Sequence, residues 1–142
     1  MINRIQGVEH IQITVHKMEA SLAFYRLLGF TEYRTIRNDS DRYTVLVLIA
    51  EPVVLELLQF DESAQPLESP RTVTAGLRTL GFRHVALRVA SVQAWCDWAT
   101  SKGLPFFSRQ LTASGAPQVF IRDPDGNLLE FTETQVSSDA RS

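Results

Sequence analysis

The sequence predicts an α+β fold in which one βαβββ module occurs twice in tandem. The first observation is that two alternating apolar segments carry a histidine at the same point, His10 in one and His84 in the other. The second is a glutamate inside an apolar run in each half, and the interval from Glu56 to Glu130 equals the interval from His10 to His84. This constant interval, the repeat spacing, indicates a duplicated structural unit, so the two halves are expected to share one architecture.

The repeat is visible in the first elements of each half. Ile11, Ile13 and Val15 alternate with polar residues, which is typical of a half-buried strand. A helical pattern then runs from Lys17 to Leu28, and Gly29 suits its left-handed end. In the second half, Ser91 is the expected N-cap, and Gly103, which follows Gly29 by the repeat spacing, closes the helix.

Three strands are expected after each helix. In the first half they cover Phe30–Arg37, Tyr43–Ala50 and Val53–Phe60, with turns at Asn38–Asp41 and Glu51–Pro52. In the second half they cover Pro105–Gln110, Gln118–Arg122 and Leu128–Thr134, with turns at Thr112–Gly115 and Asp123–Asn127.

The length of 142 residues fits one domain made of both modules. We expect module one at about residues 7–60, a linker at 61–80, module two at about 81–134 and a loose tail at 135–142. The stretch Asp61–Gly81 contains Pro66, Pro70 and Gly76 and lacks periodicity. It is interpreted as a plain spacer or as a lid, an arm or a crossover to a second subunit.

Composition limits the partners. A formal net charge of −2, with 21% charged residues of both signs, gives no reason to expect nucleic acid or a membrane surface. No apolar stretch approaches the length of a membrane span. Cys96 is the single cysteine, so no intrachain disulfide can form, and a buried thiol in the cytoplasm is expected. A small molecule is the expected partner.

His10, Glu56, His84 and Glu130 are donor types that bind divalent metal ions. Each alone has an ordinary interpretation as a residue on a half-exposed strand. Glu56, however, shares its strand face with Val54 and Leu58, and a carboxylate on an apolar face needs a partner such as a metal ion. Two imidazoles and two carboxylates suit a borderline ion such as Ni, Co, Zn, Mn or Fe(II) and leave two octahedral positions open.

These four positions, the module order and the hairpin Phe120–Asn127 resemble the vicinal oxygen chelate superfamily, which includes glyoxalase I, methylmalonyl-CoA epimerase, extradiol dioxygenases and fosfomycin and bleomycin resistance proteins. The pattern is most similar to small bacterial glyoxalase I-like proteins, through Leu55–Leu57 and Gly76–Arg78. The resemblance implies curved mixed sheets around a metal-binding cleft, and a homodimer. It also implies that the four residues named above are the metal ligands.

The resemblance further implies a metal-dependent lyase or isomerase that moves a proton next to a chelated carbonyl of a small α-oxo or hemithioacetal substrate. Glu130 is the first choice for the base and Glu56 the second. At the positions where glyoxalase I holds glutathione with arginine and asparagine, this chain has Thr14 and Phe60, so glutathione remains an open question. Arg88, on the His84 face, is a candidate substrate anchor, and a water-facing arginine is the alternative.

Two other functions compete with this one. An Fe(II) extradiol-type dioxygenase would need a 2-His-1-carboxylate triad, and a fourth donor argues against it. A drug-binding protein of the bleomycin-resistance kind would not need four metal ligands. The sequence therefore favours the enzyme, without deciding whether the site is built within one chain or between two.

Overall fold

The computed structural model describes residues 4–62, 64–66, 72–113 and 115–133, and the chain divides into two compact units, residues 1–66 and 67–142. The first unit contains β1 (Ile11–Thr14), α1 (Met18–Leu27), β2 (Thr31–Asn38), β3 (Tyr43–Ala50) and β4 (Val53–Phe60). The second contains α2 (Val73–Leu77), β5 (His84–Arg88), α3 (Val92–Ser101), β6 (Ser108–Leu111), β7 (Pro117–Arg122) and β8 (Leu128–Thr132).

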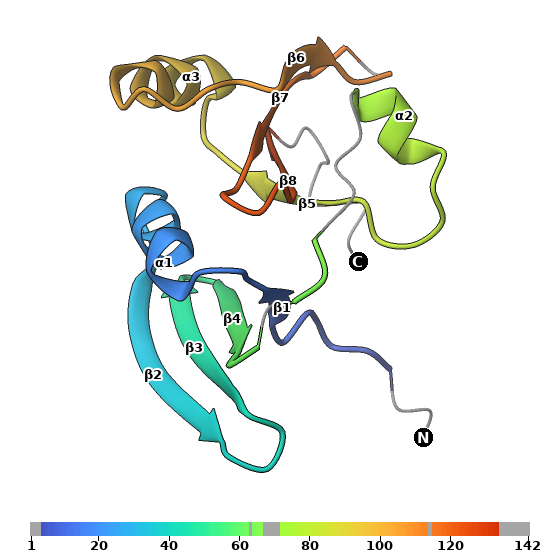
Figure 1. Cartoon of the computed structure of the whole chain (residues 1–142). Coiled ribbons are helices and arrows are strands. Elements are labelled where there is room, and N and C mark those ends of the chain that lie inside the picture. The colour runs from blue at the N-terminus through green and yellow to red at the C-terminus, as the bar shows by residue number, and fades with distance from the viewer. Residues whose placement is uncertain (1–3, 63, 67–71, 114, 134–142) are drawn as a thin grey trace. The chain divides into compact units, whose positions relative to one another are not determined.

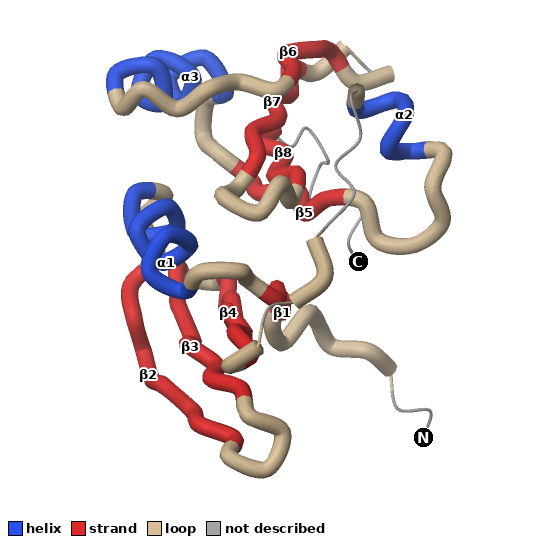
Figure 2. Tube along the Cα trace, viewed as in Figure 1, coloured by secondary structure: helices blue, strands red, loops and turns tan. Residues whose placement is uncertain are grey.

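Each unit folds into one four-stranded mixed sheet with one helix of its module beside it (Figure 1). The strand order is β1-β4-β3-β2 in the first sheet and β5-β8-β7-β6 in the second. In both sheets the first strand pairs in parallel with the fourth, and the other pairings are antiparallel. The α+β class and the repeated βαβββ order are therefore confirmed, as Figure 2 shows element by element.

The strand register follows the repeat found in the sequence. In the first sheet Gln12 stands opposite Glu56, and in the second Ala86 stands opposite Glu130. The second pair follows the first by the same repeat spacing that separates His10 from His84. The two glutamates thus occupy equivalent places at the centres of equivalent sheets.

Both module helices begin and end in equivalent ways. The first backbone amide of α1, on Met18, donates to Gln59 Oε1 at 2.5 Å, and that of α3, on Val92, donates to Glu133 Oε1 at 2.5 Å. The segment of each fourth strand therefore supplies a side chain that satisfies a free amide at its helix N-terminus. The predicted helix ends are confirmed, because Gly29 and Gly103 follow the helices with φ of 98° and 70°.

The core of the first unit lies between α1 and its sheet. Leu48 and Leu57 are fully enclosed, and Tyr25 of α1 is 1% exposed. Because strand side chains alternate between faces, β3 and β4 also present a second apolar face. That face carries the cluster Val45, Val47 and Leu58, with Tyr43 and Val54 packed against it.

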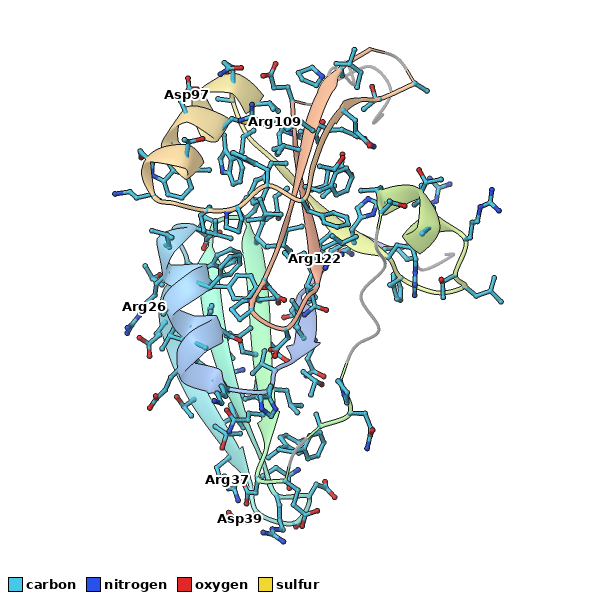
Figure 3. All side chains as sticks on the ribbon, turned by 45° about the horizontal axis from the view of Figure 1, so that its top comes forward. Arg26, Arg37, Asp39, Asp97, Arg109 and Arg122 are labelled. Atoms are coloured by element: carbon cyan, nitrogen blue, oxygen red, sulfur yellow. The ribbon has the colours of Figure 1, made fainter. Side chains whose placement is uncertain are left out.

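The core of the second unit lies between α3 and its sheet. Trp95 of α3 stacks on Phe131 of β8 with ring centroids 3.8 Å apart. Cys96 is buried on the same helix, as predicted. On β6, the guanidinium of Arg109 lies over the ring of Phe106, 4.2 Å from its centroid. Figure 3 labels Arg109 and also Arg122 of β7.

One short helix was not predicted, and two strand boundaries were wrong. Within the predicted linker, α2 begins after Thr72, whose side chain accepts from the Ala75 amide at 3.1 Å. The sequence pattern did not predict this short helix because it contains Gly76, and glycine is unfavourable inside a helix. The sixth strand begins at Ser108 and not at Pro105.

The last strand ends at Thr132, earlier than predicted, and the side chain of the next residue, Glu133, accepts from the first amide of α3. The predicted tail, Thr134 and Ser114 lie outside the described residues. Among the helices that the structure describes, none is both long and apolar enough to cross a membrane.

An ion-pair network fastens the β2–β3 hairpin to the end of β4. Arg37 donates to Asp61 through two bonds, of 2.6 and 2.7 Å, and to Asp39 at 3.0 Å; Figure 3 labels Arg37 and Asp39 at the far end of the hairpin. The bonds from Arg37 lower the pKa of Asp61, and the charge of Arg42 adds to this effect while desolvation opposes it.

Replacing Arg37 with glutamine should raise the pKa of Asp61 toward its ordinary value. A lowered folded-state pKa means that this pair stabilises the protein above the ordinary aspartate pKa, and that the stabilisation is lost as the pH falls through the lowered pKa. Carboxyl NMR titration of Asp61 in both proteins measures the shift. An unchanged pKa in Arg37→Gln would contradict the assignment.

Candidate metal centre

The first unit brings His10 and Glu56 together. His10 immediately precedes β1, and Glu56 lies on β4, which pairs with β1 in parallel. His10 Nε2 is 3.7 Å from Glu56 Oε2, and the side chains are 40% and 18% exposed. Two potential metal donors thus stand side by side in this unit.

The second unit brings His84 and Glu130 together in the same manner. His84 is the first residue of β5, and its Nε2 lies 2.9 Å from Glu130 Oε2 on the adjacent β8. These side chains are 25% and 11% exposed, so this pair is more enclosed than the first. Each unit therefore contains one His–Glu pair at an equivalent place.

Glu56 lies on a largely apolar sheet face, where an ionised group needs a partner. It stands opposite Val47 across β3 and shares its face with Val45 and Leu58. Glu130 stands opposite Phe120 across β7, but its face is mixed, because the register also places arginines of β5 and β7 on it. The prediction that Glu56 shares its face with apolar residues is thus confirmed.

Phe120 is a supporting residue that the sequence analysis missed. Its ring is 1% exposed and meets the His84 ring edge to face, with centroids 5.4 Å apart. The contact restricts the orientation of the imidazole beside Glu130. The sequence showed a large apolar residue on the strand that precedes the strand of Glu130. Only the register of β7 with β8 shows that this residue stands beside Glu130.

The first pair has two polar neighbours that the sequence analysis also missed. The carboxylate of Glu9 accepts from His10 Nδ1, and the Gln12 amide donates to Glu56 Oε2 at 3.0 Å. The hydrogen bond from Glu9 is the main cause that raises the pKa of His10; desolvation opposes it, and the charge of Glu56 adds to it. Gln12 could have been found from its position two residues after His10 on the same strand face.

Two further residues considered in the sequence, Arg88 and His16, are exposed. Arg88 is exposed at the end of β5, in register with Thr132 and on the sheet face of Glu130. His16 is exposed, as expected. Among the residues described for each unit, no three histidine, cysteine, aspartate or glutamate side chains gather in a way that could hold a metal ion. Each unit by itself therefore offers a donor pair.

The geometry of the pairs is compatible with a bound divalent ion. Two donors that bind at right angles, each about 2.1 Å from an ion, lie about 3 Å apart. The 2.9 Å between His84 and Glu130 matches this spacing, and the 3.7 Å between His10 and Glu56 needs only a small side-chain movement. Imidazole nitrogen and carboxylate oxygen together suit the borderline ions.

Comparison with solved structures gives similar folds. The protein SMU.1112c shares 25% identity with a TM-score of 0.76, covering 92% of this chain and 100% of its own. A glyoxalase family protein from Enterococcus faecalis shares 24% identity with a TM-score of 0.76, covering 90% of this chain and 98% of its own. The trypanothione-dependent glyoxalase I of Leishmania major shares 22% identity with a TM-score of 0.67, covering 93% of this chain and 89% of its own.

A search of curated protein sequences found no match. A family model gives the assignment: the model of the Glyoxalase/Bleomycin resistance protein/Dioxygenase superfamily matches residues 7–131. This match extends from the segment before β1 into β8 and so includes both His–Glu pairs. The chain belongs to the Glyoxalase/Bleomycin resistance protein/Dioxygenase superfamily.

Proposed function

We propose that the protein is a divalent-metal-dependent lyase or isomerase of the glyoxalase I kind, which acts on a small α-oxo or hemithioacetal substrate. The observation that carries the proposal is the His–Glu pair that each unit repeats at an equivalent register position. Because the described part of each unit offers one such pair, the proposed centre combines His10, Glu56, His84 and Glu130. The four come from one chain or from two chains of a dimer.

The proposed ion is Ni, Co, Zn, Mn or Fe(II), held by the two imidazoles and two carboxylates. When bound, such an ion supplies Lewis acidity to a substrate carbonyl and makes the neighbouring C–H more acidic. The chain's own task is proton transfer. A carboxylate near that carbon takes the proton and returns it to the adjacent carbon.

Glu130 is the proposed base. Glu56 Oε2 already accepts from Gln12 at 3.0 Å, which favours a fixed carboxylate. Glu130 stands opposite Ala86, which has no side-chain donor, and its contact with His84 at 2.9 Å is with another proposed ligand. Its enclosure beside Phe120 also keeps water away from the proton that it would carry. Glu56 is accordingly proposed as a permanent ligand.

Substrate anchoring is proposed for Arg88, which lies two alternations beyond His84 on the Glu130 face. The equivalent residue of the first unit, one repeat spacing earlier, is the exposed Thr14, and Phe60 packs edge to face against Tyr43 with centroids 5.5 Å apart. An anionic group of the substrate would therefore find its charge partner in the second unit.

Arg88→Gln tests the anchor. Loss of a charge-assisted hydrogen bond costs about 1.5–3 kcal/mol, so KM should rise roughly 10- to 100-fold while kcat stays near its original value. Steady-state kinetics with the active substrate measures both constants. An unchanged KM would show that Arg88 does not bind the substrate.

The function itself is tested by reconstituting the purified protein separately with each of the five ions. Isomerisation of hemithioacetals, formed from methylglyoxal and a series of thiols, is followed alongside oxygen uptake with catechols. Turnover of a hemithioacetal with bound metal supports the proposal. Oxygen consumption with Fe(II) alone would instead indicate a dioxygenase, and metal-free binding of an apolar drug without turnover would indicate a sequestering protein.

A further inference from the structure

The two His–Glu pairs occupy equivalent places, but their immediate polar neighbours differ. In the first unit Glu9 and Gln12 flank the pair and bond to its two members. The equivalent residues one repeat spacing later are Arg83 and Ala86. Arg83 donates instead to the carbonyl oxygens of Leu80 and Gly81, at 3.0 and 3.1 Å.

Glu9 determines which nitrogen of His10 is available. A carboxylate only accepts hydrogen bonds, so the Nδ1 atom that faces Glu9 carries the proton. In a neutral ring Nε2 then holds the lone pair that binds a metal ion. Because Nε2 is 3.7 Å from Glu56 Oε2, beyond hydrogen-bond distance, that lone pair is presented beside the carboxylate.

Gln12 fixes the other member of the pair. It stands opposite Glu56 in the parallel register, and its amide donates to Oε2 at 3.0 Å. A carboxylate held by a donor on the neighbouring strand loses less rotational freedom when it binds an ion. The first pair is thus oriented on both sides before any ion arrives.

The second pair lacks this orientation. His84 Nε2 lies at hydrogen-bond distance from Glu130, 2.9 Å, and His84 Nδ1 is buried without a hydrogen-bond partner among the described residues. A ring that donates from Nε2 must move its proton to Nδ1 before Nε2 can bind an ion. Among the described residues, no acceptor lies at hydrogen-bond distance from His84 Nδ1 to stabilise that proton.

We propose that Glu9 and Gln12 are positioning residues that preorganise His10 and Glu56, so that the first pair supplies the fixed donors of the metal site and the second pair adjusts to them. The proposal rests on the four-residue metal site proposed above. It assigns roles to two side chains that do not themselves bind the ion.

The first test is the ring-nitrogen NMR spectrum of the metal-free protein, at a pH where the imidazoles are neutral. His10 should show the form protonated at Nδ1, and Glu9→Gln should weaken that preference, whereas Glu32→Gln, which alters an exposed carboxylate bonded to Arg26, should not. A His10 ring protonated at Nε2 in the original protein would overturn the role of Glu9, whatever the outcome for metal binding.

The second test is Ni²⁺ affinity, measured by competition with a chelating dye. Glu9→Gln and Gln12→Leu should each weaken binding about 10-fold. This is the lower end of the loss expected when a residue that hydrogen-bonds to a metal ligand is replaced, because Glu9 and Gln12 are exposed. The matched control is Gln93→Leu, which removes a similar amide-to-carboxylate bond, to Asp97 at 2.8 Å, and should leave affinity unchanged. Glu9→Asp should retain more affinity than Glu9→Gln.

The outcomes separate the two proposals. If His10→Ala abolishes Ni²⁺ binding while Glu9→Gln and Gln12→Leu bind as tightly as the original protein, the metal site stands and the positioning role is wrong. If the original protein binds no Ni²⁺, the metal-site proposal fails, and with it the proposed role of the two residues in metal binding.

Discussion

Glu130→Gln is expected to reduce kcat by about 10²- to 10⁴-fold, the range that a positioned general base contributes. Glutamine keeps the size of the side chain and an oxygen that can bind a cation, but it cannot accept the substrate proton. The measurement is kcat with the hemithioacetal that the reconstituted protein turns over. Metal content is determined on the same sample, so that loss of the ion is not mistaken for loss of the base.

Glu56→Gln is the matched control because it makes the same change at the equivalent register position. We expect it to weaken metal binding and, once the site is saturated with metal, to leave more activity than Glu130→Gln. Full activity of Glu130→Gln would contradict the assignment of the base. A larger loss in metal-saturated Glu56→Gln would transfer that role to Glu56.

Phe131→Ala is expected to destabilise the second unit by about 3–5 kcal/mol, the usual cost of removing a buried aromatic ring. Phe131 is 4% exposed and stacks on Trp95 with centroids 3.8 Å apart. Trp95 and Trp98 are the chain's two tryptophans and both lie on α3, so tryptophan fluorescence during urea unfolding reports on this unit.

Leu111→Ala is the control within the same unit, because Leu111 is 67% exposed on β6. Its effect should stay within about 0.5 kcal/mol, as for most surface substitutions. Equal stability losses in both variants would show that the stacking of Trp95 on Phe131 is not central to the packing of α3 on its sheet.

The sequence predicted the architecture well where local patterns and the repeat agreed. Alternation around Ile11, the helical spacing before Gly29 and the constant repeat spacing all indicated the same module, and the parallel pairing of first and fourth strands follows from it. The sequence also placed one histidine and one glutamate in each half, and the strand register brings the two together within each unit.

The contacts that the sequence did not reveal are distant along the chain. The side chain of Glu133 accepts from the first amide of α3, 41 residues away in the chain. Gln59 does the same for α1, whose N-cap residue Lys17 makes no side-chain capping bond. Such caps have no local signature, because only the folded sheet places the donor and acceptor together.

The neighbours of the candidate donors were hidden for a similar reason. Alternation placed Gln12 on the His10 face, but its bond to Glu56 depends on the strand register. Phe120 likewise looked like one more apolar strand residue, although it contacts the His84 ring. A comparison of the two halves at the repeat spacing makes these differences visible.

Metal content per chain, determined by elemental analysis on protein purified without a histidine tag, tests the central claim most directly. The same measurement on His10→Ala and Glu130→Ala shows whether both units contribute to one site. The account predicts about one divalent ion per chain in the original protein and loss of that ion in both variants. Metal retained in either variant, or no metal even after reconstitution, would contradict a single site built from both His–Glu pairs.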